Sequence, residues 1–96
     1  MTCLHTISKS PASKLLSTCA SVLNPGDGIL FIEDGVYYCS LPESGRHRSS
    51  DIRLFGLKED AAARGLSVRS AADVELVDYA GFVELCCEYD KIVSWF

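Results

Sequence analysis

Short apolar runs alternate along this chain with polar or helix-forming stretches, and no other feature of the sequence constrains the fold as much. The runs lie at residues 3–7, 28–32, 51–57 and 74–77, and the tail at 91–96 has the composition of a fifth, edge strand. Short apolar strands of this kind are typical of a parallel sheet that helices cover on both faces. The alternation therefore predicts one α/β domain over residues 1–96, a three-layer α/β/α fold with a parallel sheet of four or five strands.

The stretches between the runs carry helix and turn signals. Pro11 suits the first position of a helix and Ser10 can cap its free N–H groups, which predicts a helix over residues 11–23. The other predicted segments are a helical turn at 36–39, a surface loop at 42–50, a short helix at 58–64, a connector at 66–72 and a last helix at 79–89.

Two aspartates are interpreted as helix caps. Asp34 is placed to cap the helical turn, and Asp78 is placed to cap the last helix. Apolar side chains recur along the last helix with a period of 3.6 residues, which predicts its buried face. They are Tyr79, Phe82, Val83, Cys86 and Tyr89.

We expect a flavodoxin-like strand order, 2-1-3-4-5 in chain numbering, with right-handed crossovers. In that order the sheet changes direction between the first and third strands, and ligands collect beyond their carboxyl ends. The turn Ser8-Lys9-Ser10 would then face Leu57-Lys58-Glu59. Ser8, Lys9 and Ser10 are candidates for binding a small anion, because they offer N–H groups, hydroxyls and an ammonium at a helix start. A capped turn is the simpler interpretation of the same residues.

The composition argues against several functional classes. A net charge of −4 leaves no basic field for direct binding of nucleic acid or of an anionic membrane surface. The longest apolar runs are about five residues, far short of the roughly 18 that span a bilayer. The start of the chain has neither the positive region nor the apolar region of a signal peptide. We therefore expect a cytoplasmic protein.

Five cysteines are many for 96 residues, but their spacing marks neither a disulfide framework nor a metal site. The count is odd, there is no C-x-x-C, and His5 and His47 are the two histidines, so we expect reduced thiols, no metal and no cofactor. His5 lies inside an apolar run, where a buried, hydrogen-bonded ring is a simpler interpretation than a general base. The spacing of Cys19 with Leu15 and Val22 turns its thiol toward the core.

Aromatic side chains near loops and chain ends are candidates for subunit contacts, because aromatic residues are enriched at the cores of interfaces. They are Tyr37, Tyr38, Tyr79, Trp95 and Phe96. Core packing is an equal alternative, since a domain this small also needs aromatic rings inside. If these surfaces are made for partners, the isolated chain is expected to self-associate.

Longer motifs carry a family resemblance. They are Leu-His-Thr-Ile-Ser-Lys-Ser-Pro at 4–11, Pro-Gly-Asp at 25–27, Ile-Glu-Asp-Gly-Val-Tyr at 32–37, Glu-Asp-Ala-Ala-Ala-Arg-Gly-Leu at 59–66, Val-Asp-Tyr-Ala-Gly-Phe-Val-Glu-Leu at 77–85 and Ser-Trp at 94–95. In this order and spacing the chain resembles the DsrH/TusB family over nearly its whole length. The resemblance implies a cytoplasmic sulfur-relay subunit that joins DsrE/TusD-like and DsrF/TusC-like sister subunits in an α2β2γ2 hexamer.

The chemistry that the resemblance implies is persulfide transfer between cysteines, which needs an accessible, partly ionised thiol. In the DsrE/TusD sister subunit the relay cysteine follows the third strand, where this chain reads Leu57-Lys58-Glu59-Asp60 without a cysteine. The DsrH branch resembles this chain in having a cysteine on the first helix. Cys19 is therefore the candidate persulfide carrier, in a sulfur-oxidation role with a DsrC/TusE-like acceptor.

Two alternatives stay open at this point. One is a TusB-like subunit for 2-thiolation of the tRNA wobble uridine, with a purely structural role in the hexamer. The other is a small-anion or nucleotide-binding module that uses Ser8-Lys9-Ser10.

Overall fold

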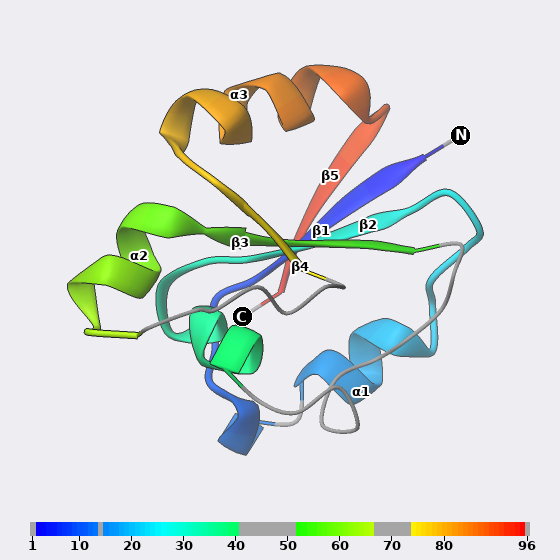
Figure 1. The fold of residues 1–96 in the computed structure, drawn as a ribbon. Helices are drawn as coiled ribbons and strands as arrows, with labels where there is room; N and C mark the ends of the chain where they lie inside the picture. The colour runs from blue at the N-terminus through cyan, green and yellow to red at the C-terminus, as the bar shows by residue number, and fades with distance from the viewer. Residues whose placement is uncertain (1, 14, 41–51, 67–73, 96) are drawn as a thin grey trace.

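The sheet of this protein is parallel and has helices on both faces (Figure 1). The computed structural model describes residues 2–13, 15–40, 52–66 and 74–95, which contain a five-stranded sheet. The strands are β1 (Cys3–Ile7), β2 (Gly28–Phe31), β3 (Arg53–Leu57), β4 (Val74–Val77) and β5 (Lys91–Trp95). The α/β class, the parallel sheet and the edge position of the last strand are confirmed. The predicted loop at 42–50 and most of the connector at 66–72 lie outside the described residues.

The strand order is β4-β3-β2-β1-β5, so the predicted flavodoxin-like order 2-1-3-4-5 is wrong. Strands β2, β3 and β4 each lie beside the strand that precedes them in the chain, and the connection from β4 to β5 crosses the sheet to the far side of β1. Because β2 separates β1 from β3, Ser8-Lys9-Ser10 does not face Leu57-Lys58-Glu59. The apolar pattern of a buried strand is the same whichever neighbour it pairs with, and it therefore carries no information about this order.

The helical segments of the described residues are η1 (Pro11–Ser13) and η2 (Glu33–Ser40), which are 3-10 helices, and α1 (Leu15–Ala20), α2 (Lys58–Ala63) and α3 (Tyr79–Glu88). The cap of α3 is confirmed, because the Asp78 carboxylate accepts the Gly81 N–H at 2.8 Å. The predicted cap Asp34 is wrong: it lies inside η2 and its carboxylate pairs with Arg64 at 3.0 Å. Within the described ranges, no helix has both the length and the apolar content to cross a membrane.

The predicted first helix is divided into two pieces. Residues 11–13 form a 3-10 turn, and the α-helical part that follows ends already at Ala20. Ser13 takes the capping role predicted for Ser10. Its hydroxyl donates to the Ser10 carbonyl at 2.9 Å and accepts the Leu15 N–H at 3.4 Å.

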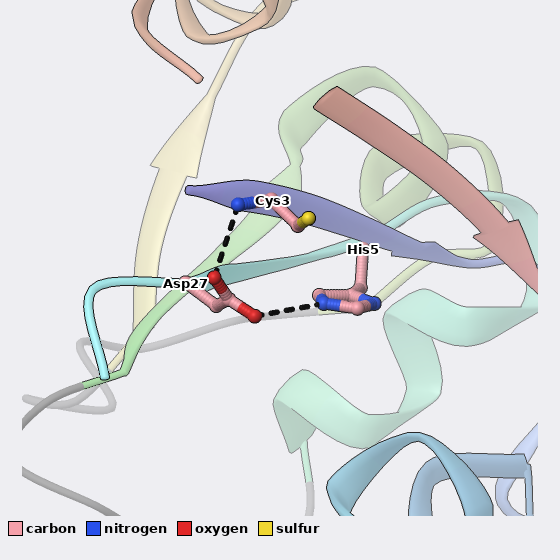
Figure 2. A group of neighbouring side chains, drawn as sticks. All are labelled: Cys3, His5 and Asp27. Atoms are coloured by element: carbon pink, nitrogen blue, oxygen red, sulfur yellow. Dashed lines mark hydrogen bonds and ion pairs between the residues drawn. The ribbon is translucent and has the colours of Figure 1, made fainter. Parts of the chain in front are cut away.

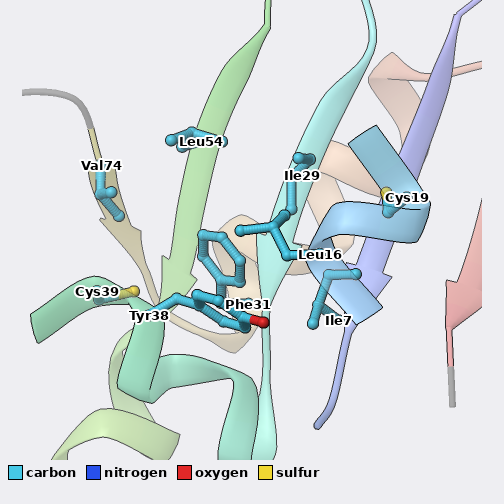
Figure 3. Close-up of a cluster of buried hydrophobic side chains, with 9 residues drawn as sticks. All are labelled: Ile7, Leu16, Cys19, Ile29, Phe31, Tyr38, Cys39, Leu54 and Val74. Atoms are coloured by element: carbon cyan, nitrogen blue, oxygen red, sulfur yellow. The ribbon is translucent and has the colours of Figure 1, made fainter. Parts of the chain in front are cut away.

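Two apolar clusters fill the space between the sheet and its helices, which confirms the three layers (Figure 1). On the side of α1 and η2 the buried cluster is Ile7, Leu16, Cys19, Ile29, Phe31, Tyr38, Cys39, Leu54 and Val74 (Figure 3). On the side of α3 it is Leu4, Leu30, Phe55, Leu57, Val77 and Leu85. Side chains alternate along a strand, so β1 sends Leu4 into one cluster and Ile7 into the other.

The buried face of α3 is turned relative to the prediction. Leu85 is buried, and Phe82 and Tyr89 pack against the same cluster. Tyr79 and Val83, expected inside, are 55% and 64% exposed. The helix is apolar around most of its circumference, so the period of 3.6 residues does not single out one stripe.

Candidate functional site

Cys19, the candidate persulfide carrier, lies in the core. Its side chain on α1 is 0% exposed and belongs to the cluster of Ile7, Leu16 and Ile29 (Figure 3). Burial, and then the negative charge of Asp27, raise the pKa of its thiol from 9.0 to about 11. Near neutral pH this sulfur is covered and protonated, as expected for a cysteine that serves as a small hydrophobic side chain.

The turn Ser8-Lys9-Ser10 connects β1 to η1. The Ser8 hydroxyl donates to the Trp95 carbonyl at 3.3 Å, and the Ser10 carbonyl accepts the Ser13 N–H at 3.0 Å. Lys9 is exposed. These hydrogen bonds join the turn to the end of β5 and to η1, which favours the interpretation as a structural turn. Anion binding by this turn stays a prediction.

A buried hydrogen-bond network joins β1, the turn before β2, and β5. At its centre is Asp27, which is 1% exposed: Oδ1 accepts the Cys3 N–H at 3.0 Å, and Oδ2 accepts the Asn24 N–H at 3.1 Å. His5 Nε2 lies 3.1 Å from Asp27 Oδ2 (Figure 2), and His5 Nδ1 lies 3.1 Å from the Trp95 indole Nε1. Burial acts to raise the pKa of Asp27, but the hydrogen bonds from Cys3, Asn24 and His5 outweigh it and hold the pKa below 3.8.

The network fixes the tautomer of His5. An indole N–H can only donate, so His5 Nδ1 offers its lone pair to Trp95. The ring proton is then on Nε2, where it donates to the Asp27 carboxylate. Both ring nitrogens are engaged and the residue is buried, so His5 holds three segments together and is not free to act as a general base.

Among the residues that the structure describes, Cys3, His5 and Asp27 form a cluster of possible metal ligands (Figure 2). Their sulfur, nitrogen and oxygen atoms lie within 4.8 Å of one another, and these atom types bind zinc in many proteins. A ligating imidazole nitrogen must present a lone pair, whereas Nε2 carries the ring proton here. Moving that proton to Nδ1 would set it against the Trp95 N–H. The group is therefore suited to hydrogen bonding rather than to coordination.

Two carboxylates in the first turn of α2 fasten neighbouring segments. Asp60 Oδ2 accepts the Glu33 N–H at 2.6 Å, at a residue with a positive φ of 49°. Glu59 Oε2 accepts the Tyr79 N–H at 3.3 Å, which ties α2 to the start of α3. The other oxygen of Glu59 is buried and has no hydrogen-bond partner among the described residues. The segment after β3 therefore carries structural contacts and no thiol.

The predicted contact aromatics divide between core and surface. Tyr38 is buried and stacks on Phe31 with ring centroids 5.1 Å apart, so its ring serves core packing. Trp95 is half-buried beside His5. Tyr37 and Tyr79 are 38% and 55% exposed and remain candidates for subunit contact. Phe96 lies outside the described residues.

Known proteins resemble this chain over nearly all of its length. The family model described as "DsrH like protein" matches residues 9–92. The chain is 31% identical over 96 residues to Protein TusB of Escherichia coli (strain K12), and 33% identical over 94 residues to Protein TusB of Pectobacterium parmentieri. In both cases the match covers 96% of this chain and 99% of the relative.

Two solved structures share the fold. The solution NMR structure of protein Tm0979 from Thermotoga maritima has a TM-score of 0.67 at 23% identity, over 90% of this chain and 92% of the other. The crystal structure of ychN protein from E. coli has a TM-score of 0.63 at 12% identity, over 99% of this chain and 100% of the other. At these identities the likeness supports the fold alone.

Proposed function

The chain belongs to the DsrH/TusB family, and we propose that it is a cytoplasmic sulfur-relay subunit of the TusB type. The complex it joins would supply sulfur for 2-thiolation of the wobble uridine of tRNA. The support for this type is the 31% and 33% identity to proteins named TusB, over nearly the whole chain. In this proposal the subunit completes the complex, and a sister subunit carries the sulfur.

The burial of Cys19 is the observation that carries the structural role. In persulfide transfer a thiolate attacks the outer sulfur of the donor persulfide, which forms a new S–S bond and releases the donor thiolate. The Cys19 sulfur is covered, and a thiol with a pKa of about 11 is almost entirely protonated at neutral pH. The Cys19 thiol is therefore neither accessible to a donor persulfide nor ionised to the thiolate that attacks it.

The other thiols of the described residues have no better claim to relay chemistry. Cys39 is buried in the core. Burial, and then the neighbouring Cys87, raise the pKa of Cys86. Cys3 lies near His5, but neither ring nitrogen of that histidine is free to accept the thiol proton. Cys87 is exposed on α3, a position that matches no sulfur site implied by the family.

We propose DsrE/TusD-like and DsrF/TusC-like subunits as partners in an α2β2γ2 hexamer, with a DsrC/TusE-like protein as the sulfur acceptor. Family membership supports these partners. The exposed apolar side chains of Tyr79 and Val83 on α3 also support them, because neighbouring apolar side chains at a surface are typical of a protein contact.

The alternative is a DsrH-type role in sulfur oxidation, with persulfide carried on Cys19. It is favoured by the family model that matches residues 9–92 and by the presence of a cysteine on α1. It also requires α1 to move off the sheet in the complex, because the Cys19 side chain is 0% exposed in the isolated fold.

Cys19→Ala separates the two functions. The chain, its own sister subunits and its acceptor are supplied to a strain that lacks this tRNA thiolation pathway, and 2-thiouridine in tRNA is measured by mass spectrometry of the nucleosides. The proposal predicts that the wild type and Cys19→Ala both restore the modification, as does the matched control Cys87→Ala.

Three results would contradict this proposal. Failure of the wild-type set to thiolate tRNA would argue against the TusB type. A folded Cys19→Ala variant that fails where Cys87→Ala succeeds would assign the sulfur to Cys19. A Cys19 that gains the mass of one sulfur atom from a persulfide donor would give the same assignment directly.

A further inference from the structure

The open side of β5 is the most exposed apolar edge in the described structure. Strand β5 ends the sheet beyond β1 (Figure 1), and its residues from Lys91 to Ser94 are all exposed. Apolar edge strands are templates for another strand, and proteins usually protect them with charges, prolines or bulges. The other edge strand, β4, carries the charged Glu75 in its middle, whereas the middle of β5 is Ile92 and Val93.

The pairing of β5 with β1 shows which of its backbone groups remain free. The Lys91 N–H donates to the Thr2 carbonyl at 3.1 Å, so Lys91 directs its backbone groups toward β1. Every second residue of a strand does the same, and Val93 therefore also faces β1. The N–H and C=O groups of Ile92 and Ser94 point away from the sheet, and no hydrogen bond to them is formed by the described residues.

We propose that two copies of this chain pair antiparallel through the open edges of their β5 strands. When the two Val93 residues face each other on the two-fold axis, Ile92 of each copy lies opposite Ser94 of the other. Opposed residues of this kind exchange both N–H···O=C bonds, so all the outward backbone groups of Ile92 and Ser94 are satisfied. A register that opposes Ile92 to Ile92, or Ser94 to Ser94, gives the other residue no partner within Lys91–Trp95, the described residues of β5. Hydrogen bonding therefore selects the register centred on Val93.

The side chains are complementary in the same register. The two Val93 residues occupy a non-hydrogen-bonded pair, in which the Cα atoms approach to about 4.5 Å and the side chains touch. Lys91 lies opposite Trp95 of the other copy, within reach of a cation–π contact, and the two lysines stay at opposite ends of the paired strands. Pairing would cover Val93 and Ile92, which are 37% and 46% exposed.

This contact involves only a second copy of the chain, so it goes beyond the proposed relay function and does not depend on it. It joins the two sheets into one continuous sheet across the axis. The contact is small, so we expect a weak dimer that forms as the protein concentration is raised.

Opposite charges at Val93 test both the dimer and its register. Val93→Lys places two ammonium groups face to face on the axis, and Val93→Glu places two carboxylates there. Each variant alone should dimerise at least about tenfold more weakly than the wild type, because like charges directly opposite one another repel. An equimolar mixture of the two variants should dimerise again, because each lysine then faces a glutamate.

Sedimentation velocity over a wide range of concentrations measures the dimer, and circular dichroism shows that each variant is folded. The matched control is Val83→Lys, the same change at a valine that is 64% exposed on α3, and it should leave dimerisation unchanged. A wild type that stays monomeric, or a Val93→Lys variant that dimerises like the wild type, overturns the proposal. Loss of the dimer in Val83→Lys moves the contact to α3 and also overturns it. Folded Val93 variants that stay apart when mixed overturn the register.

Discussion

Replacing Cys19 by alanine should make the protein more resistant to alkaline unfolding, because it removes a thiol that the fold keeps protonated. Burial and the charge of Asp27 raise the pKa of Cys19 from 9.0 to about 11. The folded protein therefore holds this proton more tightly than the unfolded chain does. The corresponding stability is complete below pH 9 and is lost as the pH rises through about 11.

The size of the effect follows from the shift. A pKa raised from 9.0 to about 11 corresponds to roughly 3 kcal/mol, at about 1.4 kcal/mol per pKa unit. Alanine leaves a small cavity in the cluster between the sheet and α1, which costs about 1–2 kcal/mol at every pH. The wild type should therefore be the more stable protein below pH 9, and Cys19→Ala should be the more stable one above pH 11.

Urea denaturation at a series of pH values measures the free energy of unfolding of both proteins, and the result is their difference as a function of pH. Cys87→Ala is the matched control, because it removes an exposed thiol and reports any effect that does not depend on burial. A difference between wild type and Cys19→Ala that stays constant through pH 11 would show that the fold does not hold the Cys19 thiol protonated. Rapid labelling of Cys19 by a thiol reagent in the folded protein would show the same.

The buried network supplies the remaining predictions. Asp27→Asn should lower the free energy of unfolding at neutral pH by about 3 kcal/mol, because its amide N–H₂ must face one of the donors that the carboxylate accepts. The pKa of Asp27 is lowered from 3.8, so the stability advantage of the wild type over Asp27→Asn should be complete above pH 3.8 and should disappear as the pH falls through the lowered pKa of Asp27. Acid unfolding measures this difference, with Asp34→Asn, which changes an exposed carboxylate, as the control. Trp95→Phe should cost about 1–3 kcal/mol by leaving His5 Nδ1 without its donor. Nitrogen NMR should show the ring proton on Nε2 in the wild type and in the variant, because the Asp27 carboxylate still accepts it, and a ring proton on Nδ1 of the wild type would argue against the assignment. The same variant should bind Zn²⁺ more tightly at Cys3, His5 and Asp27, and equal binding by calorimetry would contradict this account.

Elements that depend on neighbouring residues could be predicted from the sequence. The strands β1 and β4 begin and end where the apolar runs do, and Asp78 caps α3, because a run and a cap are local in the chain. Strand order is different in kind. It depends on which side of a strand the next one is placed, and the apolar pattern of a strand buried on both faces is the same on either side.

The hydrogen-bond network could be predicted only in part. The apolar run around His5 indicates a buried and satisfied ring, and that interpretation is confirmed. The partners of His5 could not be identified from the sequence, because Asp27 has the pattern of a turn residue and Trp95 that of a residue near the end of an edge strand. The available signal was a carboxylate immediately before a fully buried strand, where an unpaired charge would be too costly.

Cys19 shows how local physics and family resemblance can point in different directions. Its spacing with Leu15 and Val22 indicates burial, and the structure places the thiol in the core. The resemblance to the DsrH branch instead suggests a sulfur carrier. The two agree only if α1 moves off the sheet in the complex and exposes the thiol.

Native mass spectrometry of the chain co-expressed with its own sister subunits tests most directly the claim that it is a structural subunit of a sulfur relay. We expect a complex with two copies of each of the three subunits. On incubation with a persulfide donor, a sister subunit should gain sulfur and this chain should gain none. A chain recovered apart from its sister subunits would contradict the account, and so would a complex in which this chain itself carries the added sulfur.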